Sequence, residues 1–206
     1  MDAHGRFDRE DGKIVVAALG DSITAGNPGW DPDPERRKLE DPGDDATSQY
    51  LYWAQRRDPR LHCRNFGVGG ERTDEIHARL ATAVVGADVL IVQGGINDIV
   101  QGRAVERAAA DLLSMVQKGR VAGLQVAIAD VLPWNNGWPG AEPAIRTLNE
   151  AVHRIAGQEG ISVLPFYETL QDPGHPGRMA AEWTADGNHP SVEGHRRLGE
   201  IAFRID

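Results

Sequence analysis

The sequence predicts an α/β protein built on a parallel sheet that helices cover on both faces. Short apolar runs recur along the chain without alternating with polar residues, which is typical of strands buried on both sides. Between these runs, apolar residues return at the spacing of a helical turn, which predicts helices with one core-facing side. Strands that alternate with helices favour parallel pairing through helical crossovers.

Five runs are predicted as strands. Four of them are clear, and they cover residues 14–19, 89–92, 124–131 and 161–166. The run at residues 61–66 is weaker because Arg64 and Asn65 interrupt it. Four helical stripes accompany them: Ile76, Leu80 and Ala83; Val105, Ala109, Leu112 and Val116; Ile145, Leu148, Val152 and Ile155; and Leu198, Ile201, Ala202 and Ile205. We expect these stripes to pack in the core and Ser191 to cap the last helix.

The whole chain, residues 1–206, is predicted as one domain because it is long enough for one sizeable core and too short for two. The segment 27–47 interrupts the rhythm of strands and helices with four prolines and seven acidic residues. It is longer than an ordinary connection between a strand and a helix. It is either a solvated insertion or a lid over the residues that follow the first strand.

Charge and cysteine content exclude several classes of function. A net charge of −9 repels phosphate groups, so we expect neither nucleic-acid binding nor attachment to an anionic membrane. The chain has no continuous apolar run of about eighteen residues that could span a membrane. The single cysteine, Cys63, allows neither an intramolecular disulfide nor a cysteine metal cluster, and we expect it to be a small buried residue. The seven histidines show no clear metal-ligand spacing, so we predict no metal and no cofactor.

The first residues bear on the compartment. Residues 1–12 are polar and lack the apolar core of a signal peptide, which favours a cytoplasmic protein. A secreted form whose leader had been removed would have the same sequence. The sequence leaves open whether the chain forms a homodimer.

Candidate functional residues follow the predicted strands, at the sheet edge where α/β proteins bind ligands. After the first strand, the run Gly20-Asp21-Ser22 places a serine hydroxyl on a strand-to-helix turn. Ser22 is either a nucleophile or only the N-cap of a helix. Thr24 occupies the last position of a Gly-x-Ser-x-Gly motif, so the nucleophile elbow of an α/β-hydrolase is not predicted.

Two further loops offer hydrogen-bond donors. Gly67, Gly69 and Gly70 let the backbone approach a ligand closely, or they form only a tight turn. Arg72 stands where a dinucleotide-binding loop needs a third glycine, which excludes that kind of site. After the strand at 89–92, Asn97 offers a side-chain amide or caps a helix.

An aspartate and a histidine lie close together near the C-terminus. Pro190 disfavours helical geometry at His189, and Asp186 is near enough in the chain for its carboxylate to reach the imidazole. Such a pair alone is more often structural. A nucleophilic serine, however, needs a base, the base needs an orienting carboxylate, and an oxyanion needs donors. Since the chain supplies each part once, it predicts an ester hydrolase with Ser22 as the nucleophile.

Four sequence blocks together resemble those of the SGNH hydrolases, also called the GDSL esterase/lipase family. The blocks are Gly20-Asp21-Ser22, Gly70, Gly95-Ile96-Asn97-Asp98 and Asp186-Gly187-Asn188-His189-Pro190, and they extend over almost the whole chain. The resemblance implies a flavodoxin-like, three-layer α/β/α sandwich with a five-stranded parallel sheet.

The resemblance also implies a role for each residue. Ser22 is the nucleophile, His189 is the general base and Asp186 orients His189. The backbone N–H groups of Ser22 and Gly70 and the side-chain amide of Asn97 form the oxyanion hole. Gly70 is preferred to Gly69 because the donor glycine of the family closes this loop just before an acidic or polar residue.

Four of the five tryptophans fall on loops at the predicted site, namely Trp30, Trp134, Trp138 and Trp183. They are either ordinary packing or an aromatic wall for a sugar or an acyl chain. We expect a shallow pocket for short acyl esters, such as acetyl groups on a carbohydrate. The alternatives are a thioesterase or lysophospholipase with the same catalytic residues, and a non-catalytic carbohydrate-binding relative.

Overall fold

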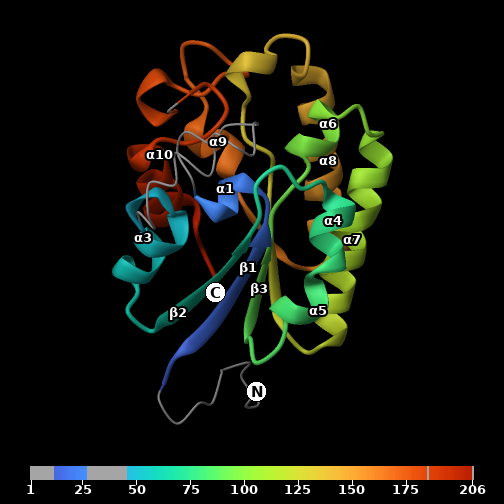
Figure 1. Cartoon of the computed structure of the whole chain (residues 1–206), viewed down its shortest axis with the longest axis vertical. Helices are drawn as coiled ribbons and strands as arrows, with labels where there is room; N and C mark the ends of the chain where they lie inside the picture. The colour runs from blue at the N-terminus through green and yellow to red at the C-terminus, as the bar shows by residue number, and fades with distance from the viewer. Residues whose placement is uncertain (1–11, 27–45, 185, 206) are drawn as a thin grey trace, which may run out of the picture.

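Five parallel strands form the centre of the molecule in the computed structural model, which describes residues 12–26, 46–184 and 186–205 (Figure 1). Their order across the sheet is β2-β1-β3-β4-β5, and every neighbouring pair is parallel. This arrangement confirms the predicted fold class. The strands are β1 (Ile14–Gly20), β2 (Leu61–Gly67), β3 (Val89–Val92), β4 (Gln125–Ala129) and β5 (Ser162–Leu164).

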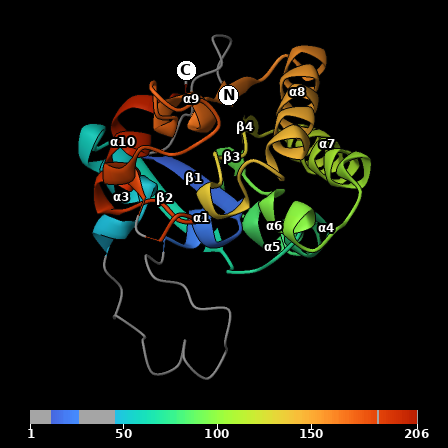
Figure 2. The ribbon, with the colours of Figure 1, turned by 90° about the horizontal axis from the view of Figure 1, so that it is seen from above.

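Helices cover both faces of this sheet (Figure 2). One layer consists of α1 (Ser22–Ala25), α3 (Tyr50–Arg57), α9 (Phe166–Leu170) and α10 (Val192–Arg197). The opposite layer consists of α4 (Thr73–Ala78), α5 (Leu80–Ala83), α7 (Val105–Val121) and α8 (Glu142–Glu159). The short helix α6 (Ile96–Val100) follows β3, and single turns lie at Ala46–Ser48, Asn135–Gly137 and Ala181–Trp183.

Apolar side chains of the sheet divide between two core clusters, one on each face. Leu90 and Val92 pack toward α4, α7 and α8, whereas Ile91 between them packs toward α3 and α9. All three side chains are fully buried, and burying each one stabilises the fold by about 1.5–3 kcal/mol. The runs are continuously apolar because both faces of the sheet are covered.

Two predicted strands are longer in the sequence than in the structure. Of residues 124–131, only Gln125–Ala129 form β4, and of residues 161–166, only Ser162–Leu164 form β5. Pro165 ends the second ladder because it has no amide hydrogen to donate, and Phe166 then begins α9. Ser191 caps α10 as predicted, since its side chain accepts a hydrogen bond from the Gly194 amide.

The last predicted stripe is partly wrong. Leu198 and Ala202 are buried, but Ile201 is 46% exposed. The cause is a π-helical turn at Leu198–Ala202, in which the amide of Phe203 donates to the carbonyl of Leu198 at 2.8 Å. This wider turn shifts the helical phase, so that Phe203 is fully buried in place of Ile201.

Three further expectations have different outcomes. Cys63 is only partly buried at the margin of the core, although burial still raises the pKa of its thiol to about 12. Residues 27–45 of the predicted insertion lie outside the described residues, and Ala46 and Thr47 begin a single helical turn. Within the described ranges, no helix is both long enough and apolar enough to cross a membrane.

Candidate active site

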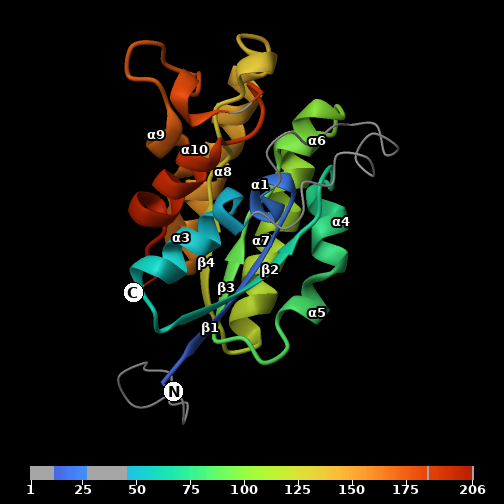
Figure 3. The ribbon, with the colours of Figure 1, turned by 60° about the vertical axis from the view of Figure 1, so that its left-hand side comes forward.

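The helix α1 begins directly at the carboxyl end of β1 (Figure 3), and Ser22 is the first residue of this helix. Asp21 is the N-cap of α1, because its carboxylate accepts the amide hydrogen of Ile23 at 2.9 Å. Ser22 is therefore the first residue of the helix rather than its cap. Gly20 leaves no room for a side chain, since a Cβ there would lie 2.3 Å from the hydroxyl of Thr24.

A buried polar network contacts the turn between β1 and α1 on its core side. The Gln93 side-chain oxygen accepts hydrogen bonds from the Thr24 hydroxyl at 2.8 Å and from the Asp21 amide at 3.2 Å. The Tyr50 hydroxyl lies 3.2 Å from the same Thr24 oxygen. Complete burial raises the pKa of the Asp21 carboxyl to about 6. The network thus connects the residues that directly follow β1 and β3 with α3, beside Ser22.

His189 and Asp186 lie in series with Ser22. The Ser22 Oγ atom is 3.1 Å from His189 Nε2, and His189 Nδ1 is 2.7 Å from Asp186 Oδ2. The other oxygen of Asp186 accepts the backbone amides of His189 at 2.7 Å and Asn188 at 2.8 Å. Partial burial raises the pKa of Asp186, but the hydrogen bonds from the His189 ring and these amides outweigh it and lower the pKa to about 2.

The loop after β4, at residues 134–136, is hydrogen-bonded to the loop that contains Asp186 and His189. The Asn135 amide donates to the Gly187 carbonyl at 3.0 Å, and the Asn136 side chain donates to the Asp186 carbonyl at 3.0 Å. The indole N–H of Trp134 donates to the side chain of Asn188. The sequence reasoning missed the two asparagines, for which no signal exists beyond their position after a strand.

Asn97 and the Gly70 loop face each other across the carboxyl ends of β2 and β3. One N–H of the Asn97 side chain donates to the Glu71 carbonyl at 2.9 Å, and the second N–H of the amide stays available as a donor. Asn97 lies inside α6, whose N-cap is Gly95, so it is not the cap. Gly70 has a φ of 81°, a left-handed conformation that favours glycine.

Asp98 joins these two loops and was not assigned a role from the sequence. Its fully buried carboxylate accepts the amide and the hydroxyl of Thr73, both at 2.9 Å, and is paired with Arg103. Thr73 begins α4, directly after the Gly70 loop. Asp98 therefore holds α6, and Asn97 with it, at a constant distance from that loop.

A cavity of about 110 Å³ opens beside Ser22. Trp134 is the predicted tryptophan that lines it. Trp138 is 44% exposed with the Arg178 guanidinium over its ring, and Trp183 is partly buried beneath that of Arg197. Trp30 lies outside the described residues. The lining residues are Ser22, Ile23, Ile96, Asn97, Val100, Trp134, Asn188 and His189.

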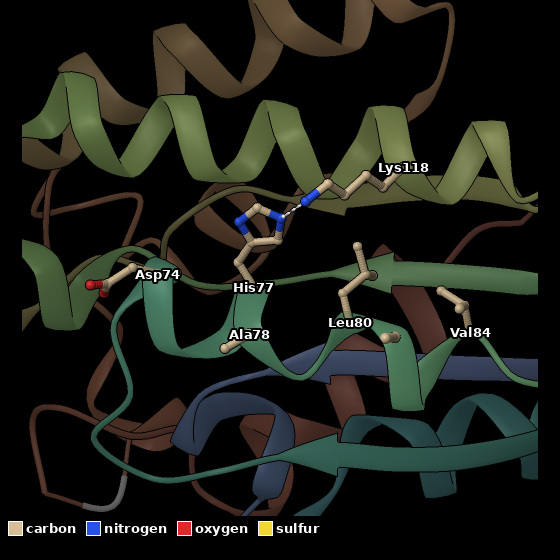
Figure 4. Close-up of a pocket in the computed structure, with 7 residues that line it drawn as sticks. Asp74, His77, Ala78, Leu80, Val84 and Lys118 are labelled. Atoms are coloured by element: carbon tan, nitrogen blue, oxygen red, sulfur yellow. Dashed lines mark hydrogen bonds between the residues drawn. The ribbon is translucent and has the colours of Figure 1, made fainter.

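A wider hollow of about 520 Å³ lies away from this cavity, between α4, α5 and α7 (Figure 4). Lys118 reaches across it to the ring of His77, with 2.8 Å between Nζ and Nε2, and Leu80 and Val84 supply apolar surface. None of the sequence-predicted site residues lines this hollow. The smaller cavity is the better candidate, because chemistry depends on converging reactive groups rather than on volume.

The residues around Ser22 match the needs of acyl transfer. A hydroxyl, an imidazole and a carboxylate lie in series, and donors border the same cavity. Among the described residues, no three histidine, cysteine, aspartate or glutamate side chains converge in a way that could hold a metal ion.

Comparison with known proteins gives one family match and many similar folds. A sequence profile of the GDSL-like Lipase/Acylhydrolase family matches residues 18–197. A G-D-S-L family protein from Desulfitobacterium hafniense superposes with a TM-score of 0.74 at 21% identity, over 91% of this chain and 97% of its own. A lipase/acylhydrolase from Enterococcus faecalis gives 0.69 at 21%, over 91% of both chains. An acetyl xylan esterase from Geobacillus stearothermophilus gives 0.65 at 19%, also over 91% of both. No curated protein sequence matches the chain.

Proposed function

Because the chain belongs to the GDSL-like lipase/acylhydrolase family and is therefore an ester hydrolase, we propose that it cleaves short-acyl esters through an acyl-enzyme formed on Ser22. The observation that carries the proposal is the hydrogen-bonded series of Ser22, His189 and Asp186, with separations of 3.1 Å and 2.7 Å. Each separation is short enough for direct proton transfer or orientation.

In the first half of the reaction, Ser22 Oγ attacks the ester carbonyl while His189 Nε2 takes the hydroxyl proton. The ionised Asp186 carboxylate holds the imidazole by its other nitrogen and stabilises the imidazolium that forms. When the tetrahedral intermediate collapses, His189 gives the proton to the leaving alcohol, and the acyl group remains on Ser22.

In the second half, water takes the place of the alcohol. His189 removes a proton from the water as it attacks the acyl carbonyl, and the proton then returns to Ser22 Oγ. The carboxylic acid leaves, and the enzyme is restored. The net reaction consumes one ester and one water and releases one alcohol and one carboxylic acid.

Three donors would stabilise the negative oxygen in both intermediates. Ser22 opens α1, so the helix itself does not use its amide N–H. The backbone N–H of Gly70 and the second N–H of Asn97 are the other two donors. Donors fixed in place before the reaction stabilise the transition state without further reorganisation.

The size of the cavity favours a small acyl group. Its volume of about 110 Å³ is well below the roughly 300–1,000 Å³ of pockets that hold a drug-sized ligand. Ile23, Ile96 and Val100 supply apolar surface for a methyl or a short alkyl group. The similarity to an acetyl xylan esterase agrees with an acetyl ester, and Trp134 offers an aromatic surface for a sugar alcohol.

A series of p-nitrophenyl esters from acetate to laurate tests the proposal, with Ser22→Ala as the matched control. We expect the largest kcat/KM for the esters from acetate to butyrate, and no hydrolysis of any ester by Ser22→Ala. An optimum at the long chains would contradict the short-acyl specificity. Preferred turnover of acyl-CoA or of lysophospholipid would assign the same residues to a thioesterase or a lysophospholipase instead.

A further inference from the structure

Arg79, at the junction of α4 and α5, makes an unusual set of contacts with the proposed oxyanion hole. Its guanidinium donates to the Phe66 carbonyl at 2.8 Å and to the Gly20 carbonyl at 3.2 Å. It also grips the carboxylate of Glu71 through Nε at 2.9 Å and Nη2 at 2.6 Å. One side chain thus joins β1, β2 and the Gly70 loop.

Each proposed oxyanion donor is within two residues, or one hydrogen bond, of a residue that Arg79 contacts. Gly20 precedes Ser22 by two residues on the same tight turn. Glu71 directly follows Gly70, and its carbonyl accepts the side-chain N–H of Asn97 at 2.9 Å. A shift of Arg79 would therefore disturb all three donors together.

We propose that Arg79 is a positioning residue that sets the mutual distances of the three oxyanion donors. This inference rests on the proposed function of Ser22. The planar guanidinium suits the task because its N–H groups diverge at constant angles toward three different acceptors. A lysine carries a single point of charge and cannot reach the same three groups with the same geometry.

The competing explanation is an ion pair that only stabilises the fold. Arg79 and Glu71 are partly buried, with 27% and 20% of their side chains exposed, so their pairing would contribute to stability in either case. Kinetics separates the two explanations, because donors that act on the oxyanion affect the transition state more than substrate binding. A purely structural role predicts only a smaller folded fraction.

The test compares Arg79→Lys with Arg120→Lys, whose ion pair with Glu159 joins α7 and α8 away from the cavity. For Arg79→Lys we expect kcat per folded molecule to fall by about 10-fold to 10²-fold, with KM changed by less than about threefold. The affinity for a boronic acid, which forms a tetrahedral adduct on serine, should fall in parallel. Arg120→Lys should retain wild-type values.

Two further variants keep the test decisive if Arg79→Lys folds poorly. Glu71→Gln leaves the Phe66 and Gly20 contacts in place and should lower kcat less than Arg79→Lys. Arg79→Ala should regain part of its kcat when guanidinium is added below denaturing concentrations, with sodium chloride as the control. Near-ultraviolet circular dichroism gives the folded fraction of each variant.

The outcomes distinguish this inference from the function on which it rests. Ser22-dependent hydrolysis with an unchanged kcat in Arg79→Lys overturns the positioning role alone, as does a loss that matches the unfolded fraction. Absence of Ser22-dependent hydrolysis in the wild type overturns both.

Discussion

Two serines in this chain, Ser22 and Ser114, each lie within hydrogen-bonding distance of a histidine whose second nitrogen faces an aspartate. Around Ser22 the separations are 3.1 Å to His189 and 2.7 Å from His189 to Asp186. Ser22 lies in the first turn of α1, whereas His189 and Asp186 lie in the loop between Trp183 and α10. Their cavity also contains Asn97, a side-chain donor.

Around Ser114 the same residue types are arranged differently. Ser114 Oγ is 3.3 Å from His77 Nε2, but His77 Nδ1 is 3.7 Å from Asp111 Oδ1, which is too far for a hydrogen bond. The Lys118 ammonium lies 2.8 Å from the same Nε2 atom. Since an ammonium can only donate, His77 Nε2 is the acceptor, and its lone pair is not free to take a proton from Ser114.

The backbone also separates the two serines. Ser22 opens α1, so its amide N–H has no partner within the helix. Ser114 lies in the interior of α7, where each amide N–H is used by the carbonyl four residues earlier. Neighbouring serine, histidine and aspartate side chains are therefore insufficient for acyl transfer, which also needs donors for the oxyanion beside the hydroxyl.

Replacing each serine in turn gives the largest expected effect. Ser22→Ala removes the proposed nucleophile, and we expect kcat for p-nitrophenyl acetate to fall by about 10⁴-fold or more. Ser114→Ala should leave kcat unchanged. A fluorophosphonate probe followed by peptide mass spectrometry should find its label on Ser22 and not on Ser114.

Replacing the two aspartates comes next. Asp186→Asn keeps the size of the side chain but removes the charge that, in the proposed mechanism, orients and stabilises the imidazolium, so we expect kcat to fall by about 10³–10⁴-fold. Asp111→Asn should leave kcat unchanged, and an equal loss in both variants would contradict the assignment of Asp186.

The pH dependence of stability tests the state of Asp186 independently of kinetics. The pKa of Asp186 is lowered from 3.8 to about 2, so its ionised form is favoured in the folded state. Its contribution to stability is therefore present above a pH of about 4 and is lost as the pH falls through about 2. In urea unfolding, the stability difference between wild type and Asp186→Asn should shrink over that window.

Removing the side-chain donor has an intermediate effect. Asn97→Ala should lower kcat by about 10²–10³-fold with a small change in KM, because the proposed role of this donor is to act on the developing oxyanion. Gln117→Ala removes an exposed amide from α7, the helix that carries Ser114, and should leave both constants unchanged. We call Ser114, His77 and Asp111 the second set. Similar effects of the two variants on steady-state kinetics would show that Asn97 acts through folding.

We expect the weakest effect from removing Lys118, which tests whether its ammonium alone keeps Ser114 unreactive. Lys118→Met frees the imidazole of His77 from the ammonium, yet the interior of α7 still supplies no oxyanion donor. We therefore expect no hydrolysis in the double variant Ser22→Ala with Lys118→Met, and no probe on Ser114. Activity in this double variant would show that the ammonium alone keeps the second set inactive.

Much of the fold could be predicted from local pattern. Runs such as 89–92 are apolar on both sides because both faces of the sheet are covered, and this pattern can be recognised in the sequence. The failures occur where a local device changes the phase or the length of an element. Pro165 shortens the last strand. The π-helical turn places Ile201 on the exposed side, and the spacing of apolar residues does not predict this turn.

The candidate site was predictable for residues that belong to motifs and not for residues that hold them. Ser22, Asn97, Asp186 and His189 stand in recognisable blocks, and the structure brings them to one end of the sheet. Arg79 makes hydrogen bonds to groups 8, 13 and 59 residues away in the chain. No local pattern encodes such contacts, because they depend on which loops the fold brings together.

Residue type and short-range spacing were enough to predict the succession of strands and helices along the chain, the family and the residues proposed for the chemistry. The three-dimensional arrangement was needed to see that Ser22 is not a helix cap, and that Trp134, rather than Trp138 or Trp183, lines the cavity. It also separated the serine beside His189 from the one beside His77. The physical reason is that distance, direction and competing partners govern reactivity, and all three are set by side chains far apart in the sequence.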